Sequence, residues 1–192
     1  MIFDGSTPRT ELVSGRYDYF GLEWGSTSAV LYAFDQSSPE SFLTLNVSGA
    51  GPTLNQHYDG IVTPFTNNMH FDAGTGLVYT DGGQAIQPAT GAIAGTYSAS
   101  GIAVPDSTLN RVFILGQTSA QAHTSNYTIQ SFDQSKFTSV SYITIQNVIG
   151  TPTGLVRWGS NGLAFTTRVG SPWSFIGSGP GQLYVIQGNF VQ

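Results

Sequence analysis

Histidine and aspartate stand close together at two places in the sequence, and either pair could support acid–base chemistry. His57 and Asp59 form the first pair, and His70 and Asp72 form the second. A histidine oriented by a carboxylate can act as a general base, and residues two positions apart on a strand point to the same face. These four residues are the candidates for a catalytic site.

Metal binding is the second chemistry that these residues suggest. With His57 or His123 as a further ligand, His70 and Asp72 could complete a zinc site. The chain has three histidines and no cysteine, and the histidines form neither a His-x-His nor a His-x-x-x-His pattern. Asp81 and a backbone carbonyl could hold a calcium ion, but no Asp-rich calcium loop surrounds it. We therefore expect no metal and no other cofactor.

Structural roles explain the same residues without any chemistry. Asp59 and Gly60 form a turn dipeptide, which makes His57 part of an ordinary polar loop. Asp72 opens a glycine-containing turn in the same way. His70 occupies a repeated position whose other occupants share no ligand chemistry: Glu23, Ala103 and Arg157. These explanations outweigh the catalytic one, and we expect the repeated position to face a channel or a neighbouring repeat.

Aromatic side chains point to binding rather than catalysis. Trp173 lies in the segment 170–177, an insertion without a counterpart elsewhere in the sequence. An exposed tryptophan there could stack on a sugar or another flat ligand, and Tyr58 is the second candidate ligand-binding residue. Trp24 and Trp158 occupy equivalent positions of a repeat that elsewhere holds phenylalanine or valine, so we expect these two in the core.

A fourfold repeat must position all of these residues. Each copy is an apolar-polar-apolar triplet that runs into a turn and then into a second apolar strand. The triplets are Leu22–Trp24, Met69–Phe71, Ile102–Val104 and Val156–Trp158. Their third residues stand 47, 33 and 54 positions apart, close on average to the roughly 40–50 residues of a β-propeller blade.

Short strands and turn residues predict an all-β fold. Asn161 and Gly162 give the strongest hairpin signal, and no stretch shows the spacing of an amphipathic helix. We predict a β-propeller of about four blades, each a four-stranded antiparallel meander, in a single domain covering residues 1–192. The blades are expected near residues 16–60, 61–98, 99–150 and 151–192.

The two ends of the chain bear on how such a ring would close. Residues 10–15 form a spare strand, and the last unit offers a third strand at 181–187 but no clear fourth one. Exchange of terminal strands would remove exposed sheet edges. The exchange within one chain predicts a closed four-bladed ring, whereas exchange between chains predicts half of a larger ring completed by a second copy. A fragment of a larger propeller is the third alternative.

The composition limits the partners and the compartment. Charged residues make up 9% of the chain, against about 25% in ordinary soluble domains, and the net charge is −5. The six lysines and arginines are scattered, so we expect no binding to nucleic acid. No run approaches the roughly 18 apolar residues of a membrane span, so we expect no membrane insertion. The polar, weakly charged composition favours an extracellular, periplasmic or cell-surface protein whose export signal is not in this chain.

Some of these sequences resemble a known family. The resemblance rests on Asp72–Tyr79, followed by Thr90 and Gly91, and on the paired Glu23–Ser26 and Arg157–Ser160. The chain is similar, over about residues 10–187, to bacterial β-propeller repeat proteins of the YVTN and quinoprotein-like groups. The resemblance implies a propeller with one loop-rich face. Members range from inert binding scaffolds to lactonases and lyases, so the fold alone does not assign an activity.

Three functions remain open on the sequence. We favour a non-catalytic binding or interaction scaffold of an exported bacterial protein, with a protein or a glycan as its ligand. The first alternative is a propeller hydrolase or lyase that uses His57, Asp59 and His70. The second is a structural module that oligomerises in a surface assembly. An enzyme would bring at least two of the histidine and aspartate candidates into one pocket.

Overall fold

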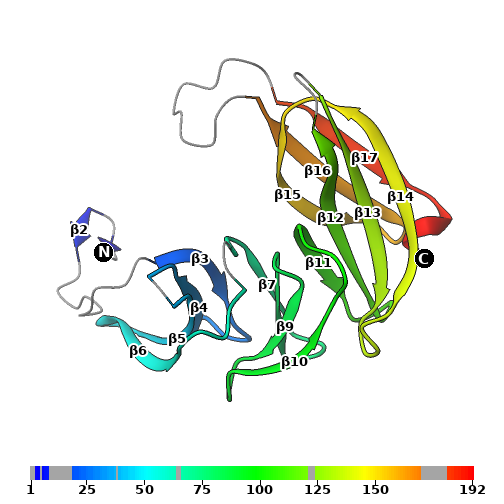
Figure 1. Cartoon of the computed structure of the whole chain (residues 1–192). Helices are drawn as coiled ribbons and strands as arrows, with labels where there is room; N and C mark the ends of the chain where they lie inside the picture. Colours follow the sequence, from blue (N-terminus) through cyan, green and yellow to red (C-terminus); the bar gives the residue numbers. More distant parts are fainter. Residues whose placement is uncertain are drawn as a thin grey trace. The chain divides into compact units, whose positions relative to one another are not determined.

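The computed structural model describes residues 3–4, 6–8, 19–37, 39–63, 66–120, 124–169 and 181–192 (Figure 1). Its elements are β-strands, apart from one short 3-10 helix, η1 (Asn189–Val191). Within these ranges no helix has the length and apolar character needed to cross a membrane. The predicted all-β fold class is confirmed.

Four antiparallel meanders, the blades of the predicted propeller class, follow one another along the chain. The first sheet comprises β3 (Tyr19–Trp24), β4 (Val30–Asp35), β5 (Ser41–Ser48) and β6 (Gly51–Tyr58). The second comprises β7 (Met69–Asp72), β8 (Leu77–Thr80), β9 (Gln84–Gln87) and β10 (Ala92–Thr96). The third comprises β11 (Ile102–Asp106), β12 (Arg111–Ala120), β13 (Ser125–Asp133) and β14 (Ser139–Val148). The fourth comprises β15 (Thr151–Trp158), β16 (Gly162–Arg168) and β17 (Leu183–Gln187).

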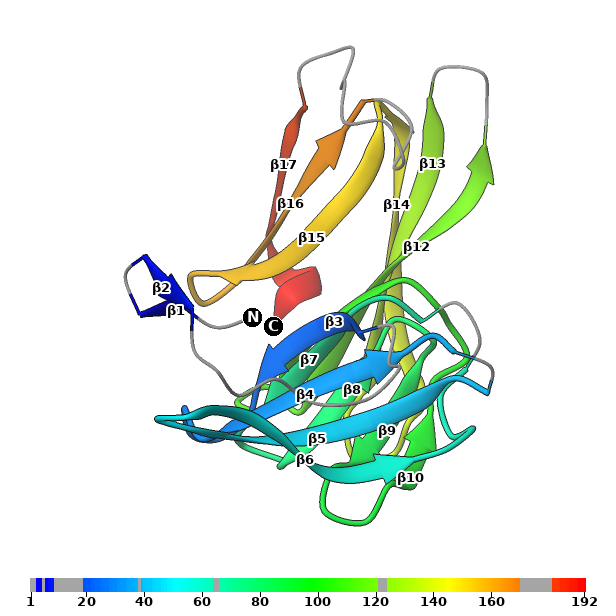
Figure 2. The same ribbon diagram turned by 90° about the vertical axis from the view of Figure 1, so that its left-hand side faces the viewer.

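Strands that are neighbours in sequence are neighbours in each sheet, as expected for hairpin-linked meanders. Figure 2 shows this order in the first sheet, from β3 to β6. The last residues of the chain form η1 rather than a fourth strand, so the last meander has three strands in the described part of the chain. Two short strands near the start, β1 (Phe3–Asp4) and β2 (Thr7–Pro8), pair with each other. The strand expected at 10–15 lies outside the described residues.

The chain divides into two compact units, residues 1–96 and 97–192, with two meanders in each. In the first unit a hydrophobic core joins the two sheets. Its buried side chains are Tyr32, Phe34 and Phe42 from the first sheet, followed by Val62, Met69, Val78 and Ile86. Full burial of such side chains stabilises the fold by about 1.5–3 kcal/mol each. A polar link accompanies this core, because the carboxylate of Glu23 accepts a hydrogen bond of 3.2 Å from the backbone N–H of Phe71.

The second unit has its own core between the third and fourth sheets. The fully or nearly fully buried side chains are Phe113, Leu115, Tyr127, Ile129, Val148, Leu155, Leu163, Phe165 and Val191. The rings of Tyr184 and Phe165 stack with centroids 4.7 Å apart, and those of Phe190 and Phe113 meet edge to face with centroids 5.9 Å apart. Val191 and Phe190 belong to η1, so the C-terminal turn is part of this core rather than a loose end.

The expectation that Trp24 and Trp158 belong to the core is wrong. Their side chains are 54% and 52% exposed. Side chains alternate along a strand, and in both copies the middle residue of the triplet, Glu23 or Arg157, faces the neighbouring sheet of its unit. The tryptophans must therefore point to the opposite face. The middle position was expected to face a channel or a neighbouring repeat, and for these two residues the contact with a neighbouring repeat is confirmed.

The turns also correct the register of the third copy. β7 ends at Asp72 and β11 ends at Asp106, and each aspartate opens a four-residue turn. Counted back from these aspartates, Val104 and not Ala103 is the counterpart of His70. The expected register was off by one residue because the start of β11 is apolar throughout, and such a run lacks the alternation from which register is read.

Candidate functional site

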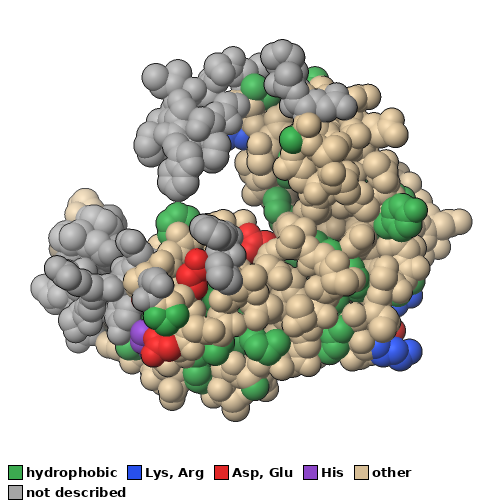
Figure 3. All heavy atoms as spheres, viewed as in Figure 1, with side chains coloured by type: hydrophobic (Ala, Val, Ile, Leu, Met, Phe, Trp, Pro, Cys, Tyr) green, Lys and Arg blue, Asp and Glu red, His purple; other side chains and the backbone are tan. Residues whose placement is uncertain are grey.

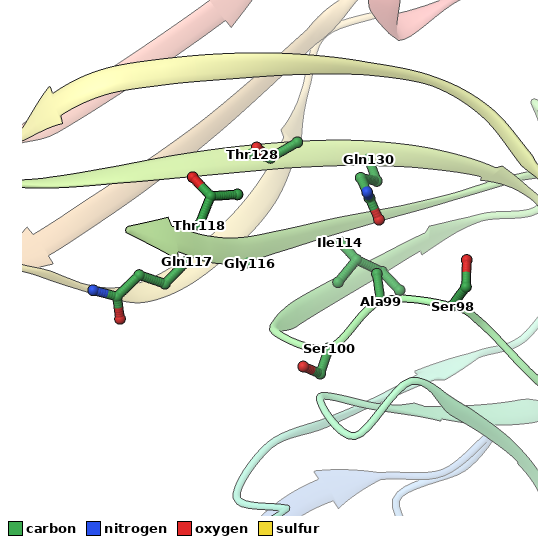
Figure 4. A pocket seen from close by; sticks show the side chains of 9 residues that line it. All are labelled: Ser98, Ala99, Ser100, Ile114, Gly116, Gln117, Thr118, Thr128 and Gln130. Carbon is green, nitrogen blue, oxygen red and sulfur yellow. The ribbon is translucent and has the colours of Figure 1, made fainter. Parts of the chain in front are cut away.

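A polar hollow with a volume of about 190 Å³ opens on the third sheet, within the second unit (Figure 4). The residues that line this polar hollow are Ser98, Ala99, Ser100, Ile114, Gly116, Gln117, Thr118, Thr128 and Gln130. The first three form a loop that leads into β11, and the others lie on β12 and β13. Its volume is below the roughly 300–1,000 Å³ of drug-sized ligand sites, so it suits a small group.

The hollow exists because one strand position lacks a side chain. Gly116 on β12 lies opposite Thr128 on β13, and a Cβ atom on Gly116 would lie only 2.6 Å from the backbone oxygen of Ser100. The loop can therefore cross the strand only at a glycine. Next to it, Gly101 has a φ of +139° and approaches the backbone oxygen of Leu115 in the same way. These two glycines allow the loop, which forms the wall of the hollow, to pack directly on β12, which forms part of its floor.

Tyr97 anchors the start of the same loop. Its side chain is 4% exposed, and its ring contacts Phe132 and Phe137 at centroid distances of 5.2 and 5.1 Å. Its hydroxyl group donates a hydrogen bond of 3.2 Å to the backbone oxygen of Gln134. A loop held by a buried aromatic residue at one end and two close-packed glycines at the other has a defined position, which a binding site requires.

Only neutral side chains line the polar hollow. Serine and threonine hydroxyl groups can each donate and accept hydrogen bonds, and glutamine amides carry both functions on separate atoms. The Oε1 atom of Gln130 is buried and accepts no hydrogen bond from the described residues. Figure 4 shows this amide turned toward the loop, beside Ile114 and Ala99. A buried acceptor without a donor costs about 1–3 kcal/mol.

The first catalytic candidate pair is in contact. His57 Nε2 lies 3.1 Å from Asp59 Oδ1, and the same carboxylate oxygen accepts a hydrogen bond of 3.2 Å from the Ser41 hydroxyl group. His57 sits at the end of β6, opposite Leu43. The Asp59 side chain is 70% exposed, so the pair lies at the surface of the first unit rather than in a dry site.

His70 and Asp72, the second candidate pair, make separate structural contacts. His70 Nδ1 lies 3.8 Å from the carboxylate of Glu23, which makes it part of the contact between β3 and β7. Asp72 accepts hydrogen bonds from the backbone N–H groups of Gly74 and Thr75 at 3.3 and 3.2 Å. Asp72 therefore holds the turn that follows β7, as its structural explanation predicted.

The four candidates do not line the polar hollow. His57 contacts Asp59, and His70 contacts Glu23, so each histidine has a different carboxylate nearby. Among the described residues, no three histidine, aspartate or glutamate side chains gather as a metal site would require. His123, which could have joined them, lies outside the described residues.

The carboxylate of Asp81, the candidate calcium ligand, accepts hydrogen bonds from the segment that precedes β7. Its carboxylate accepts hydrogen bonds from the backbone N–H groups of Asn67 and Asn68, at 3.1 and 3.2 Å, and from the Asn68 side chain. Burial raises the pKa of this carboxyl above its ordinary value, and the hydrogen bonds from Asn67 and Asn68 oppose that shift. The Asp81 carboxylate therefore has a structural role, because it fixes the backbone of Asn67 and Asn68.

The aromatic candidates stand apart from the polar hollow. Tyr58 stacks on Phe42, with ring centroids 6.3 Å apart and planes inclined by 12°. A Cβ atom on Gly91 would lie 2.4 Å from the Tyr58 ring, so this ring packs on the turn between β9 and β10. Trp173 and its insertion, residues 170–177, lie outside the described residues.

Sequence reasoning missed the polar hollow altogether. The sequence held a faint signal, because Thr128 and Gln130 are polar and occupy alternate positions on one face of a strand. The structure shows that Thr128 is only 8% exposed. Buried polar residues in a strand are more informative than exposed ones. The loop that completes the hollow comes from the preceding segment, and its approach to Gly116 has no sequence signature.

Charged groups are sparse across the surface seen in Figure 3, in keeping with the composition.

A comparison with models of known protein families finds none that matches the chain, and a comparison with curated proteins finds no match either.

Proposed function

We propose that the chain is a non-catalytic binding module and that the polar hollow is its ligand site. The observation that carries the proposal is the lining of the hollow, in which six of the nine residues carry a hydroxyl or amide group and none carries a charge. Hydroxyl and amide groups both donate and accept hydrogen bonds. A ligand with several hydroxyl groups can pair with such a lining.

The size of the hollow favours a glycan over a protein as the ligand. Protein partners bury roughly 800 Å² on each side, from about 20–30 residues, whereas nine residues line this hollow, whose volume is about 190 Å³. One ring of a saccharide is a small group with several hydroxyl groups. A bacterial exported scaffold of the YVTN or quinoprotein-like type, with a glycan as its ligand, is the full form of the proposal.

A binding screen on the full chain tests the proposal. Backbone amide NMR signals of Gly116 and Thr128 report on the floor of the hollow, and glucose, N-acetylglucosamine, triglycine and adenosine monophosphate serve as probes. At least one probe should shift both signals in a saturable way. The proposal is wrong if all four leave these signals unchanged, even where they move signals elsewhere.

The contact between His57 and Asp59 keeps the hydrolase alternative testable. p-Nitrophenyl acetate and p-nitrophenyl glucoside are suitable substrates, because their release of p-nitrophenol is followed directly. We expect no hydrolysis above the buffer rate. A rate that the His57→Gln substitution abolishes would instead establish an enzyme and contradict the non-catalytic proposal.

A further inference from the structure

We infer that Tyr142 extends the polar hollow into a longer site, in which a glycan of two or more rings places one ring in the hollow and stacks the next on the Tyr142 side chain. This inference rests on the proposed function, because it names the length of the ligand and a second contact beside the same site. Three features of the third sheet support it: the strand register, the exposure of the Tyr142 ring and the uncharged surface around that ring.

The register of the third sheet places Tyr142 next to the hollow. Tyr142 on β14 pairs with Gln130 on β13, and Gln130 is one of the lining residues. Paired residues of antiparallel strands point to the same face of the sheet, with Cβ atoms about 4.5–5.5 Å apart. The Tyr142 side chain therefore begins one strand away from the lining and on the same face.

The fold makes little use of the Tyr142 ring. Tyr142 is 68% exposed, whereas Ile143, the next residue of β14, packs against the core of the second unit. Single exposed apolar residues are common on protein surfaces, so exposure alone assigns no role to Tyr142. Its position beside the hollow does, because an exposed aromatic ring offers a flat apolar face on which a sugar ring can stack.

The walls of the hollow give a longer ligand a direction. On the β11 side the loop closes over β12, where Gly116 lies against the backbone of Ser100. On the other side no residue of β14 belongs to the lining, and Thr144, which pairs with Thr128, is exposed. From β12 to β14 is two strand spacings, about 10 Å, which two linked sugar rings can span. A ligand that begins over Gly116 can thus continue across β13 to Tyr142.

The surface along this path has the chemistry of a saccharide site. Thr128 and Thr144 carry hydroxyl groups, which can donate and accept hydrogen bonds. Neither these residues nor the rest of the lining carries a charged side chain. A purely apolar ligand would leave the hydroxyl and amide groups unpaired, and a single sugar ring in the hollow would leave Tyr142 unused. Linked sugar rings, with hydroxyl edges and apolar C–H faces, use both parts.

Titrations of the full chain compare single rings with linked pairs of the same ring. Glucose is compared with maltose and cellobiose, and N-acetylglucosamine with N,N′-diacetylchitobiose, each followed by the amide NMR signals of Gly116 and Thr128. At least one disaccharide should bind about tenfold more tightly than its single ring, the effect of one stacked ring face. The same disaccharide should shift the ring proton signals of Tyr142, which the single ring should leave in place.

Three variants assign the gain in affinity to the Tyr142 ring. Tyr142→Ala should weaken the disaccharide to the level of its single ring and leave binding of the single ring unchanged, whereas Tyr142→Phe keeps the ring and should retain most of the gain. Because Tyr142 is mostly exposed, the thermal unfolding temperature of Tyr142→Ala should stay close to that of the unaltered chain. Leu183→Ala, the control, removes a side chain of similar exposure, 67%, from β17 and should leave all binding unchanged.

The possible failures are distinguishable. Disaccharides that bind no more tightly than their single rings, while both shift the Gly116 and Thr128 signals, would overturn the role of Tyr142 and leave the hollow as a glycan site. Tight disaccharide binding that survives Tyr142→Ala would do the same. If none of these sugars shifts the Gly116 and Thr128 signals, the inference fails together with the glycan form of the proposed function.

Discussion

Arg157 and Asp106 form a partly buried ion pair that joins β15 to β11 in the second unit. The Nε atom of Arg157 lies 2.7 Å from Oδ2 of Asp106, and the two side chains are 18% and 13% exposed. The guanidinium group also donates to the backbone oxygens of Gly162 and Ser160, at 2.7 and 3.2 Å, and lies 5.5 Å from the centre of the Phe113 ring. The Arg157 side chain thus contacts a carboxylate, two carbonyl groups of a turn and an aromatic ring.

We expect the Arg157→Met substitution to lower the free energy of unfolding by about 2–4 kcal/mol. It removes the donor to Oδ2 of Asp106 and to two carbonyl groups, and breaking a buried pair on one side is more costly than replacing both partners. The double variant with Asp106→Asn should therefore lose less than the sum of the two single variants. Urea unfolding followed by tryptophan fluorescence measures all three.

An exposed cation gives the control for this ion pair. Lys136 lies 3.7 Å from Asp133, and its side chain is 75% exposed, so Lys136→Met should cost less than about 1 kcal/mol. Additive losses in the Arg157 and Asp106 variants would show that the two residues act independently, contrary to the structure.

We expect Trp24→Ala and Trp158→Ala each to cost no more than about 1 kcal/mol, because roughly half of each side chain is exposed. Core tryptophan residues cost about 3–5 kcal/mol on the same substitution. Phe113→Ala is the buried comparison, since Phe113 is 0% exposed, and it should lose about 3–5 kcal/mol. A loss of that size at either tryptophan would restore the core position that the repeat suggested.

The repeat predicted the strands well and the packing less well. Turn residues and alternation predicted four antiparallel meanders, as the structure has them, because local chemistry decides hairpins. Which face of β3 or β15 is covered depends instead on the neighbouring sheet, so an apolar residue such as Trp24 could not be assigned from its own strand. The charged middle residues Glu23 and Arg157 were the better guide, since each needs a partner on the neighbouring sheet.

The candidate site shows the same limit more sharply. His57 and Asp59 were recognisable because they are two residues apart, and they are in contact. Gln130 and Ser100 are thirty positions apart, and they line one hollow only because a loop crosses β12 at Gly116. Such long-range approaches depend on how segments pack, and no local pattern encodes them.

Asp133 should give the protein a measurable loss of stability in acid. Hydrogen bonds to its carboxylate, above all from the Ser135 hydroxyl group at 2.9 Å and then from the Lys136 backbone N–H, lower its pKa to about 2. A carboxyl whose pKa is lower in the folded than in the unfolded state stabilises the fold above its unfolded pKa of about 4. That contribution is lost as the pH falls from about 4 toward 2.

The test compares the chain with Asp133→Asn by urea unfolding at pH 6, 4, 3 and 2. The difference in stability between the two should be largest at pH 6 and should shrink steadily below pH 4. Ser135→Ala should weaken this pH dependence, whereas Lys136→Met should preserve it because the hydrogen bonds in the turn, rather than the lysine charge, cause the shift. A difference that is the same at all four pH values would contradict the assignment.

Gly116→Ala should close the polar hollow and destabilise the second unit by about 1–3 kcal/mol. The added Cβ would lie 2.6 Å from the backbone oxygen of Ser100, a contact that only a movement of the loop can relieve, and such overpacking carries a cost of this size.

Gly154, in β15, is the matched control, because a Cβ there meets no atom within 4 Å. Gly154→Ala should be neutral or slightly stabilising, since alanine loses less backbone entropy on folding than glycine. Amide NMR signals of Ser98 and Ser100 should move in the first variant and stay in place in the second. Equal stability of the two variants, with an unmoved loop, would show that β12 and the loop are farther apart than the structure places them.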